Sequence, residues 1–399
     1  MAGLKWQRSG GVAIPMQLTG DLEKTINAVP LLPFDERVLD LLNDLSKRLI
    51  KVREYSDVAT FGFWCRKTAL LKEKRNYDDL HQRLGKGVVF HSTPSNVPVN
   101  FAFSFVAGLL AGNANIVRLP GKDFEQVTII VNAITELLEG EYSDLAPYLC
   151  FVKYATDKAL HDKFSSVCDV RVVWGGDGTI NEFRKSPLKP RATELTFADR
   201  YSIAVIKADA YLKAEDKQKI AQDFYNDTYF SDQNACTAPR IVYWMGENRE
   251  DAKEAFWANI KILARERYEL APVQAVGKLA AFYRAAAHRE VTLVDSDDSH
   301  VTRVYVEDAD DNLMEYKYNS GFYFERDIEK LEEILPISGE RLQTLTYLGL
   351  TKEELTEFFA VCRPKGIDRA VPMGKSMDFS LVWDGYDLIR QLSRRITIE

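Results

Sequence analysis

Apolar residues in the first 80 positions recur at the spacing of an α-helix. One set falls on a single face of a helix with 3.6 residues per turn: Val38, Leu41, Leu42, Leu45 and Leu49. The residues between them are largely polar and suit a solvent-facing side. The pattern predicts that residues 21–80 are mainly helical.

From Gly85 onward, short runs of β-branched residues alternate with helical stretches. Strands are predicted at 88–90, 115–119, 150–152, 170–173 and 203–206. Helices are predicted at 98–111, at 157–166, and between Asp123 as the N-terminal cap and Gly140 as the end. Such alternation is typical of a parallel sheet with right-handed crossovers. The sequence therefore predicts a doubly wound α/β domain.

Ligands of a doubly wound sheet bind at the carboxyl ends of its strands, where turns lead into helix N-termini. The usual dinucleotide motif GxGxxG is absent. Two turns are candidates in its place, His91–Pro98 after the first strand and Trp174–Thr179 after the fourth. The second contains Gly-Gly-Asp-Gly-Thr, which is also similar to the glycine turn of diacylglycerol kinases and NAD kinases. A nucleotide-binding kinase is therefore one alternative function.

Composition narrows the function classes. The 399 residues are 46% hydrophobic and 28% charged, as in ordinary soluble proteins of two to three domains. A net charge of −7 without a basic tract argues against binding of nucleic acid or anionic lipid. Five cysteines without a CxxC pair indicate reduced thiols, and no apolar stretch is long enough to span a bilayer. We expect a soluble, cytoplasmic enzyme.

Three sequence blocks carry a more specific signal. They are HSTPSNVPVNF at 91–101 with AGLLAGNANIVRLP at 107–120, SDQNACTAP at 231–239, and GIDRAVPMG at 366–374 with WDGYDLI at 383–389. In this order they resemble the LuxC-type acyl-CoA reductases of the aldehyde dehydrogenase superfamily. The resemblance implies an aldehyde-dehydrogenase-like α/β fold. We expect a helical region at 1–85, a doubly wound dinucleotide-binding domain at 86–228, an α/β catalytic domain at 229–385, and a returning C-terminal strand within 386–399.

Cys236 is the predicted nucleophile. Its neighbours at 232–234 and 237 are polar, which suits a thiolate that must be exposed to attack a carbonyl. The resemblance implies that the Asn96 amide and the backbone N–H of Cys236 hold the developing oxyanion. An asparagine that only shapes a turn between two prolines is the alternative. We expect His91 to be hydrogen-bonded in place and not to catalyse.

The resemblance also places a nicotinamide cofactor. Arg118 stands where superfamily members carry a lysine that reaches the adenosine ribose. A guanidinium suits a 2′-phosphate, so NADPH is favoured and NADH stays possible. The glycine-rich turn before a helix that starts near Thr179 would face the pyrophosphate, with Gly175, Gly176 and Gly178. Glu325 matches the ribose-binding glutamate by interval only, and an exposed glutamate beside a helix is the alternative.

The implied reaction is the reduction of an acyl thioester, acyl-CoA or acyl-protein, to an aldehyde through an acyl-cysteine. No metal is assigned. The resemblance further implies a homo-oligomer and an acyl-protein synthetase as partner. A non-catalytic scaffold and an acid-forming aldehyde dehydrogenase are further alternatives. Aligned on Arg200, the base position of the acid-forming enzymes holds Thr196, although Glu194 could restore a base after a register shift.

Overall fold

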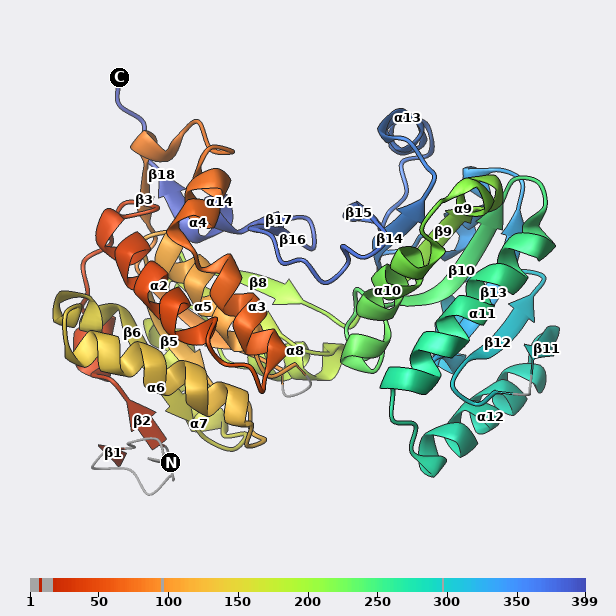
Figure 1. Ribbon diagram of the computed structural model, residues 1–399. Coiled ribbons are helices and arrows are strands. Elements are labelled where there is room, and N and C mark those ends of the chain that lie inside the picture. Colours follow the sequence, from red (N-terminus) through yellow and green to blue (C-terminus); the bar gives the residue numbers. More distant parts are fainter. Residues whose placement is uncertain (1–6, 9–16, 95–96, 296–297) are drawn as a thin grey trace. The chain divides into compact units, whose positions relative to one another are not determined.

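The computed structural model describes residues 7–8, 17–94, 97–295 and 298–399, and its elements are labelled in Figure 1. The chain forms two compact units. The first comprises residues 1–198 and 380–399, and the second comprises residues 199–379. The second unit is therefore an insertion into the first. The predicted division at 228 and 385 differs from this division at 198 and 379.

A seven-stranded sheet forms the centre of the first unit, in the order β1-β2-β6-β5-β4-β7-β8. Its parallel strands are β4 (Val88–Ser92), β5 (Ala114–Arg118), β6 (Leu149–Lys153), β7 (Val170–Trp174) and β8 (Thr193–Phe197). The short strands β1 (Gln7–Arg8) and β2 (Gln17–Thr19) continue it antiparallel. The chain builds outward from β4 through β5 to β6 and then reverses to β7 and β8. The turns after β4 and β7 therefore flank the switch point, where doubly wound sheets bind ligands.

Helices cover both faces of this sheet. They are α1 (Leu22–Ile26), α2 (Glu36–Leu49), α3 (Ser56–Trp64), α4 (Lys67–Lys74), α5 (Asn100–Leu110), α6 (Glu125–Glu139), α7 (Lys158–Val167), α8 (Asp177–Arg184) and α14 (Leu388–Leu392). The predicted helical region 21–80 and the three predicted crossover helices are confirmed. The predicted cap of α6 is wrong. Phe124 occupies the cap position without a side-chain bond, because the Asp123 carboxylate instead pairs with Lys153.

The second unit has its own seven-stranded sheet, in the order β11-β12-β13-β10-β9-β14-β15. Its strands are β9 (Tyr201–Lys207), β10 (Pro239–Met245), β11 (Val291–Asp295), β12 (Thr302–Val306), β13 (Phe322–Ile328), β14 (Leu342–Leu348) and β15 (Arg369–Pro372). Only the edge strand β11 runs antiparallel to its neighbour. The predicted strand at 203–206 is confirmed, but its assignment to the first sheet is wrong. It pairs with β10 and β14 in the second.

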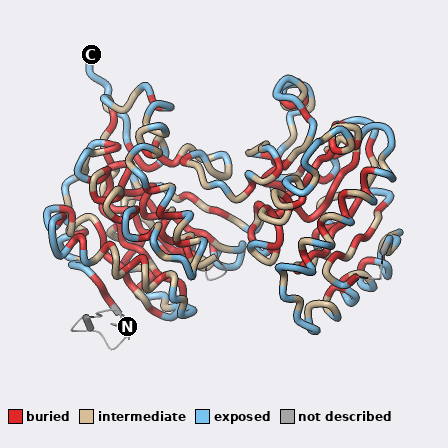
Figure 2. The backbone as a smooth tube through the Cα atoms, viewed as in Figure 1, coloured by how far each residue is buried: buried red, intermediate tan, exposed pale blue. Residues whose placement is uncertain are grey.

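One face of the second sheet packs on α9 (Ala208–Lys213), α10 (Lys217–Asp227) and α11 (Arg249–Arg267). The other packs on α12 (Pro272–Ala286), α13 (Lys352–Cys362), η4 (Asp311–Tyr316) and η5 (Leu331–Ile337). Figure 2 shows the buried stretches of the backbone concentrated in both sheets. The two units thus have separate cores of helices on a sheet.

After the second unit the chain returns to the first through the hairpin β16 (Val382–Trp383) and β17 (Tyr386–Asp387). The last strand, β18 (Ser393–Arg395), pairs antiparallel with β3 (Arg83–Gly85). A returning C-terminal strand is therefore present within residues 386–399. Its partner is a strand of the first unit of the same chain.

Candidate functional site

Cys236 lies in the loop between η3 (Tyr229–Ser231) and β10. None of the five cysteines forms a disulfide. Three of them are fully buried, and burial raises the pKa of Cys65 and raises those of Cys150 and Cys168 to about 12. Such thiols do not form thiolates at neutral pH. Only Cys236 and Cys362 are partly exposed, and of these only Cys236 lies in a loop with polar neighbours.

The loop before Cys236 has a fixed, unusual backbone. Asp232 and Gln233 both adopt left-handed conformations, with φ of 51° and 53°. The Gln233 side chain is fully buried, and its oxygen accepts from the Gly321 N–H at 2.7 Å and the Phe322 N–H at 3.2 Å. Its amide nitrogen donates to the carbonyls of Pro239 and Phe322. These four bonds compensate the strain of the turn and tie it to the start of β13.

Residues 374–377, at and just after the end of the GIDRAVPMG segment, contact the cysteine loop and the end of α10 within the second unit. Thr237 donates its hydroxyl to the Met377 sulfur at 3.2 Å. Asp227, at the end of α10, accepts from the backbone of Gly374 at 2.6 Å and from the backbone and hydroxyl of Ser376. Burial raises the pKa of Asp227 to about 6, although these donors oppose the shift. Thr237 of the cysteine loop and Met377, which are 140 residues apart in the chain, are thus in contact.

Arg118 ends β5 at the carboxyl edge of the first sheet. Its guanidinium lies over the Tyr154 ring, 4.7 Å from Cζ to the ring centroid. Its two hydrogen bonds are long, 3.5 Å to the Ser92 hydroxyl and 3.4 Å to the Tyr154 carbonyl. Its Nε has no hydrogen-bond partner among the described residues. No carboxylate of those residues forms an ion pair with the Arg118 guanidinium. This cation has donors available for an anionic ligand.

The glycine-rich turn after β7 leads into α8, which begins at Asp177, two residues earlier than predicted. Gly176 is the N-terminal cap, and Thr179 donates its N–H to the Gly176 carbonyl at 2.8 Å. A Cβ built on Gly176 or Gly178 would meet no atom within 4 Å, whereas one on Gly175 would lie 3.1 Å from the Thr179 side chain. The turn is therefore open to a ligand at Gly176 and Gly178.

His91 is completely buried, as expected for a residue held in place. Its Nδ1 lies 2.8 Å from the Ser104 hydroxyl and its Nε2 lies 2.9 Å from the Asn115 side-chain oxygen. Burial lowers its pKa to about 4, so the ring is neutral at physiological pH. The ring positions α5 against the sheet. Asn96, the predicted oxyanion donor, lies outside the described residues.

Glu325 differs from the prediction. It lies on β13, 1% exposed, and not beside a helix on the surface. One oxygen accepts from the indoles of Trp244 and Trp257 at 2.9 and 2.5 Å, and the other pairs with Arg303 at 2.7 Å. A ribose has no access to a carboxylate in these surroundings. The interval match that suggested a cofactor role is therefore better explained as a structural ion pair within the second unit.

The alternative base Glu194 is also held by cations. Its carboxylate accepts from Arg171 at 2.5 Å and from Arg184 at 2.9 Å. Arg171 is buried and further bonded to Ser165 and Ser186. Both oxygens of the Glu194 carboxylate are thus held in ion pairs with Arg171 and Arg184.

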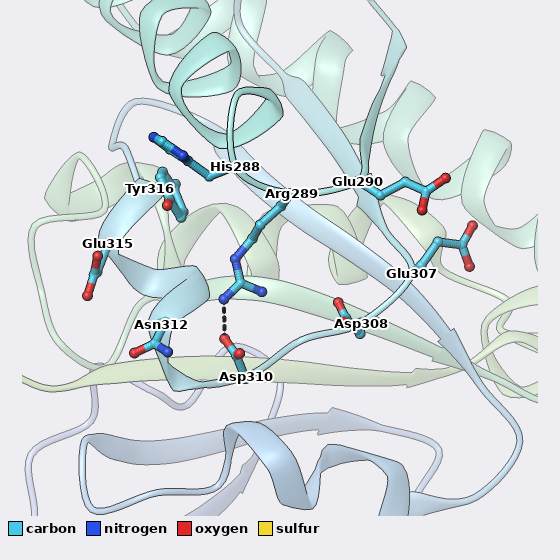
Figure 3. A pocket seen from close by; sticks show the side chains of 9 residues that line it. All are labelled: His288, Arg289, Glu290, Glu307, Asp308, Asp310, Asn312, Glu315 and Tyr316. Carbon is cyan, nitrogen blue, oxygen red and sulfur yellow. Dashed lines mark hydrogen bonds and ion pairs between the residues drawn. The ribbon is translucent and has the colours of Figure 1, made fainter.

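A polar pocket in the second unit, shown in Figure 3, is a separate feature. Its lining is mostly charged: His288, Arg289, Glu290, Glu307, Asp308, Asp310, Asn312, Glu315 and Tyr316. Arg289 pairs with Asp310 at 2.5 Å across it. None of these residues belongs to the cysteine loop or to the carboxyl edge of the first sheet. Within the described part of the chain, no cluster of His, Cys, Asp or Glu suits a metal ion, and no helix has the length and apolarity to cross a bilayer.

The two sheets and the cysteine loop define an aldehyde dehydrogenase fold. A solved structure of PnpE from Pseudomonas sp. WBC-3 in complex with nicotinamide adenine dinucleotide superposes with a TM-score of 0.66 at 14% identity, over 93% of this chain and 86% of that one. A NAD-dependent aldehyde dehydrogenase from Sinorhizobium meliloti gives 0.64 at 12% identity, over 92% and 82%. The acyl-CoA reductase (LuxC) family model matches residues 66–395. The chain belongs to this family.

Named relatives are distant. The long-chain acyl-protein thioester reductase of Aliivibrio fischeri is 26% identical over 164 residues, 41% of this chain and 33% of the relative. That of Photorhabdus laumondii is 21% identical over 322 residues, 78% of this chain and 63% of the relative. The matched region therefore spans between a third and two thirds of these relatives.

Proposed function

We propose that the protein reduces a fatty acyl thioester to the aldehyde with NADPH, through an acyl-Cys236 intermediate. The single observation that carries the proposal is the partly exposed Cys236 thiol in a braced polar loop of a LuxC-family chain. The names of the relatives support a long-chain acyl thioester as the substrate class. The soluble, cytoplasmic setting and the homo-oligomer are part of the same proposal.

The chemistry proceeds in two half-reactions. The Cys236 thiolate attacks the thioester carbonyl, a tetrahedral oxyanion forms, and the carrier leaves as its thiolate. The backbone N–H of Cys236 and the Asn96 amide are proposed to donate to this oxyanion. When bound, a reduced nicotinamide would supply a hydride to the acyl carbon. The resulting thiohemiacetal oxyanion would re-form the carbonyl, which breaks the C–S bond and releases the aldehyde and the Cys236 thiolate.

The carboxyl edge of the first sheet is the proposed cofactor site. The open turn at Gly176 and Gly178 gives a pyrophosphate access to the N-terminus of α8. Arg118 has donors for a 2′-phosphate, which favours NADPH over NADH. The carrier of the acyl group is CoA or a protein thiol, and an acyl-protein synthetase is the proposed partner.

The test combines turnover with labelling. The purified protein is incubated with acyl-CoAs of graded chain length and NADPH, and cofactor oxidation and aldehyde are measured. Radioactive acyl-CoA should label the wild type, Cys150→Ala and Cys362→Ala, but not Cys236→Ala. Labelling that persists in Cys236→Ala contradicts the nucleophile, and absence of aldehyde at every chain length contradicts the reaction.

A further inference from the structure

Arg240, the second residue of β10, is a buried cation without an acidic partner. It is 6% exposed, and among the described residues no carboxylate lies within ion-pair distance of it. A buried charge is normally paired, because removing it from water is costly. Arg240 instead donates to neutral oxygens. It lies four residues after Cys236 in the chain.

The guanidinium joins the cysteine loop to the segment before β13. Nη2 donates to the Gln233 carbonyl, in the left-handed part of the loop. Nη1 donates to the Tyr318 carbonyl at 2.8 Å and to the Asn319 side-chain oxygen at 2.7 Å. The Asn319 amide in turn donates to the Asn234 side chain at 2.6 Å. Arg240 thus fixes the loop two to three residues before Cys236.

Two carboxylates, Asp199 and Asp232, act on the charge of Arg240, but neither forms an ion pair with it. Asp232, in the loop, accepts from Ser320 at 2.8 Å and from the Tyr268 hydroxyl. Asp199 lies 3.6 Å from Lys317, a second cation whose charge interacts with Arg240. The remaining groups in this environment are Arg341 and the Tyr323 hydroxyl. The surroundings of the loop therefore remain net positive.

The charge of Arg240 and that of Cys236 act on each other. Burial lowers the pKa of Arg240 to about 10, and a negative Cys236 is among the groups that oppose this shift. Such interactions are reciprocal, so a cation that is stabilised by the thiolate also stabilises the thiolate. The hydrogen bonds to Gln233 and Asn319 hold that cation beside the loop.

We propose that Arg240 is a positioning residue for Cys236, which fixes the nucleophile loop and supplies the positive charge that favours its thiolate. The assignment rests on the proposed role of Cys236 as the nucleophile. It adds a residue that acts through Cys236 without touching substrate or cofactor. It also explains why a buried arginine is bonded to neutral oxygens and not to a carboxylate.

The test measures thiolate formation independently of acyl transfer. In a Cys362→Ser background, the rate of alkylation of Cys236 by iodoacetamide is followed from pH 5 to 10, because the other three cysteines are fully buried. Arg240→Met should move the midpoint upward by about one pH unit and slow alkylation at pH 7 about tenfold. Arg240→Lys keeps the positive charge, so the midpoint of its alkylation profile should stay close to that of the wild type. Melting curves verify that each variant is folded.

Asn319 provides a second test that leaves Arg240 in place. Asn319→Asp replaces the amide oxygen that accepts from Arg240 with a negatively charged carboxylate oxygen. It should therefore raise the pH midpoint of Cys236 alkylation, as Arg240→Met does. Asn319→Ala removes the bond without adding charge and should raise it much less. Equal midpoints in all folded variants overturn the proposal, and so does an equal shift in Asn319→Asp and Asn319→Ala. If the alkylation midpoint shifts as expected in the variants but acyl-CoA never acylates Cys236, the proposed function is contradicted. The effect of Arg240 on the Cys236 thiolate then still stands.

Discussion

In the proposed function, the preference for NADPH over NADH depends on the guanidinium of Arg118. Arg118→Glu reverses a charge that has only long hydrogen bonds within the protein. Loss of a charge-assisted contact to a 2′-phosphate costs on the order of 1.5–3 kcal/mol, or about 10- to 150-fold in affinity for NADPH. NADH, which lacks this phosphate, serves as the control and should change little. An unchanged KM for NADPH would show that Arg118 does not contact the phosphate.

In the proposed function, the residues Thr196 and Glu194 decide whether an acyl-enzyme is hydrolysed. A threonine hydroxyl cannot take a proton from water near neutral pH, and Glu194 is paired with Arg171 and Arg184. A positioned base typically increases the rate of such a step by roughly 10²–10⁴-fold. Acyl-Cys236 should therefore persist in buffer until a thiol or a hydride donor is added. Its lifetime is measured by mass spectrometry after removal of excess acyl-CoA.

Hydrolysis as fast as reductive turnover would favour an acid-forming dehydrogenase. In that case the Glu194→Gln variant shows whether Glu194 or another group is the base for hydrolysis. Slower hydrolysis in this variant would identify Glu194 as the base despite its ion pairs. Unchanged hydrolysis would exclude Glu194.

At the scale of elements, the turn between β7 and α8 can be tested without disturbing the fold. Gly176→Ala and Gly178→Ala place a Cβ in open space, and Gly178→Ala within a helix should stabilise it by roughly 0.5–1 kcal/mol. A methyl group there would obstruct a pyrophosphate, so cofactor affinity should fall while the melting temperature holds. The comparison is a cofactor titration beside a thermal melt. Full affinity in both variants would mean that this turn does not bind the cofactor.

Local pattern was enough to predict most elements but not their partners. Periodicity located the strands at 88–90 and 203–206, yet nothing local says which sheet a buried strand joins. The Asp123 cap failed because Lys153, thirty residues away, pairs with the carboxylate. Position alone could not show that Glu325 is buried between two indoles and Arg303. These outcomes depend on tertiary contacts.

In the candidate site, too, local sequence indicates some features and tertiary contacts determine the others. The motif around Cys236 was sufficient to single out a candidate nucleophile, and this assignment stays a prediction. The contacts of Gln233 and Arg240 run to residues about 80 positions away, so the chain near the cysteine shows only that its residues are polar. An arginine directly after the motif around Cys236 is the local signal that could have suggested the role of Arg240.

At the scale of the whole molecule, His91 makes stability depend on pH. Its pKa is about 4 in the folded chain and about 6.5 when unfolded. The unfolded chain therefore binds the extra proton, and stability that is complete above pH 6.5 is lost as the pH falls towards 4. The expected loss is on the order of 3 kcal/mol in the free energy of unfolding of the first unit.

Urea unfolding at pH 7 and pH 4, followed by hydrogen exchange of β4 and β5, measures this loss. His91→Gln removes the titrating ring and should flatten the profile, although its stability at pH 7 will be lower because the bonds to Ser104 and Asn115 are disturbed. A profile as steep as that of the wild type would assign the proton to another group.

The insertion of the second unit into the first also governs biogenesis. A ribosome makes residues 1–198 first, but β3 then lacks β18, and the buried amide of Asn113 lacks the Leu392 carbonyl to which it donates. Residues 199–379 are a continuous stretch and can fold as soon as they emerge. The half of the protein that is synthesised first is therefore the half that is completed last. The strand β3 therefore stays without its partner β18 during nearly half of translation.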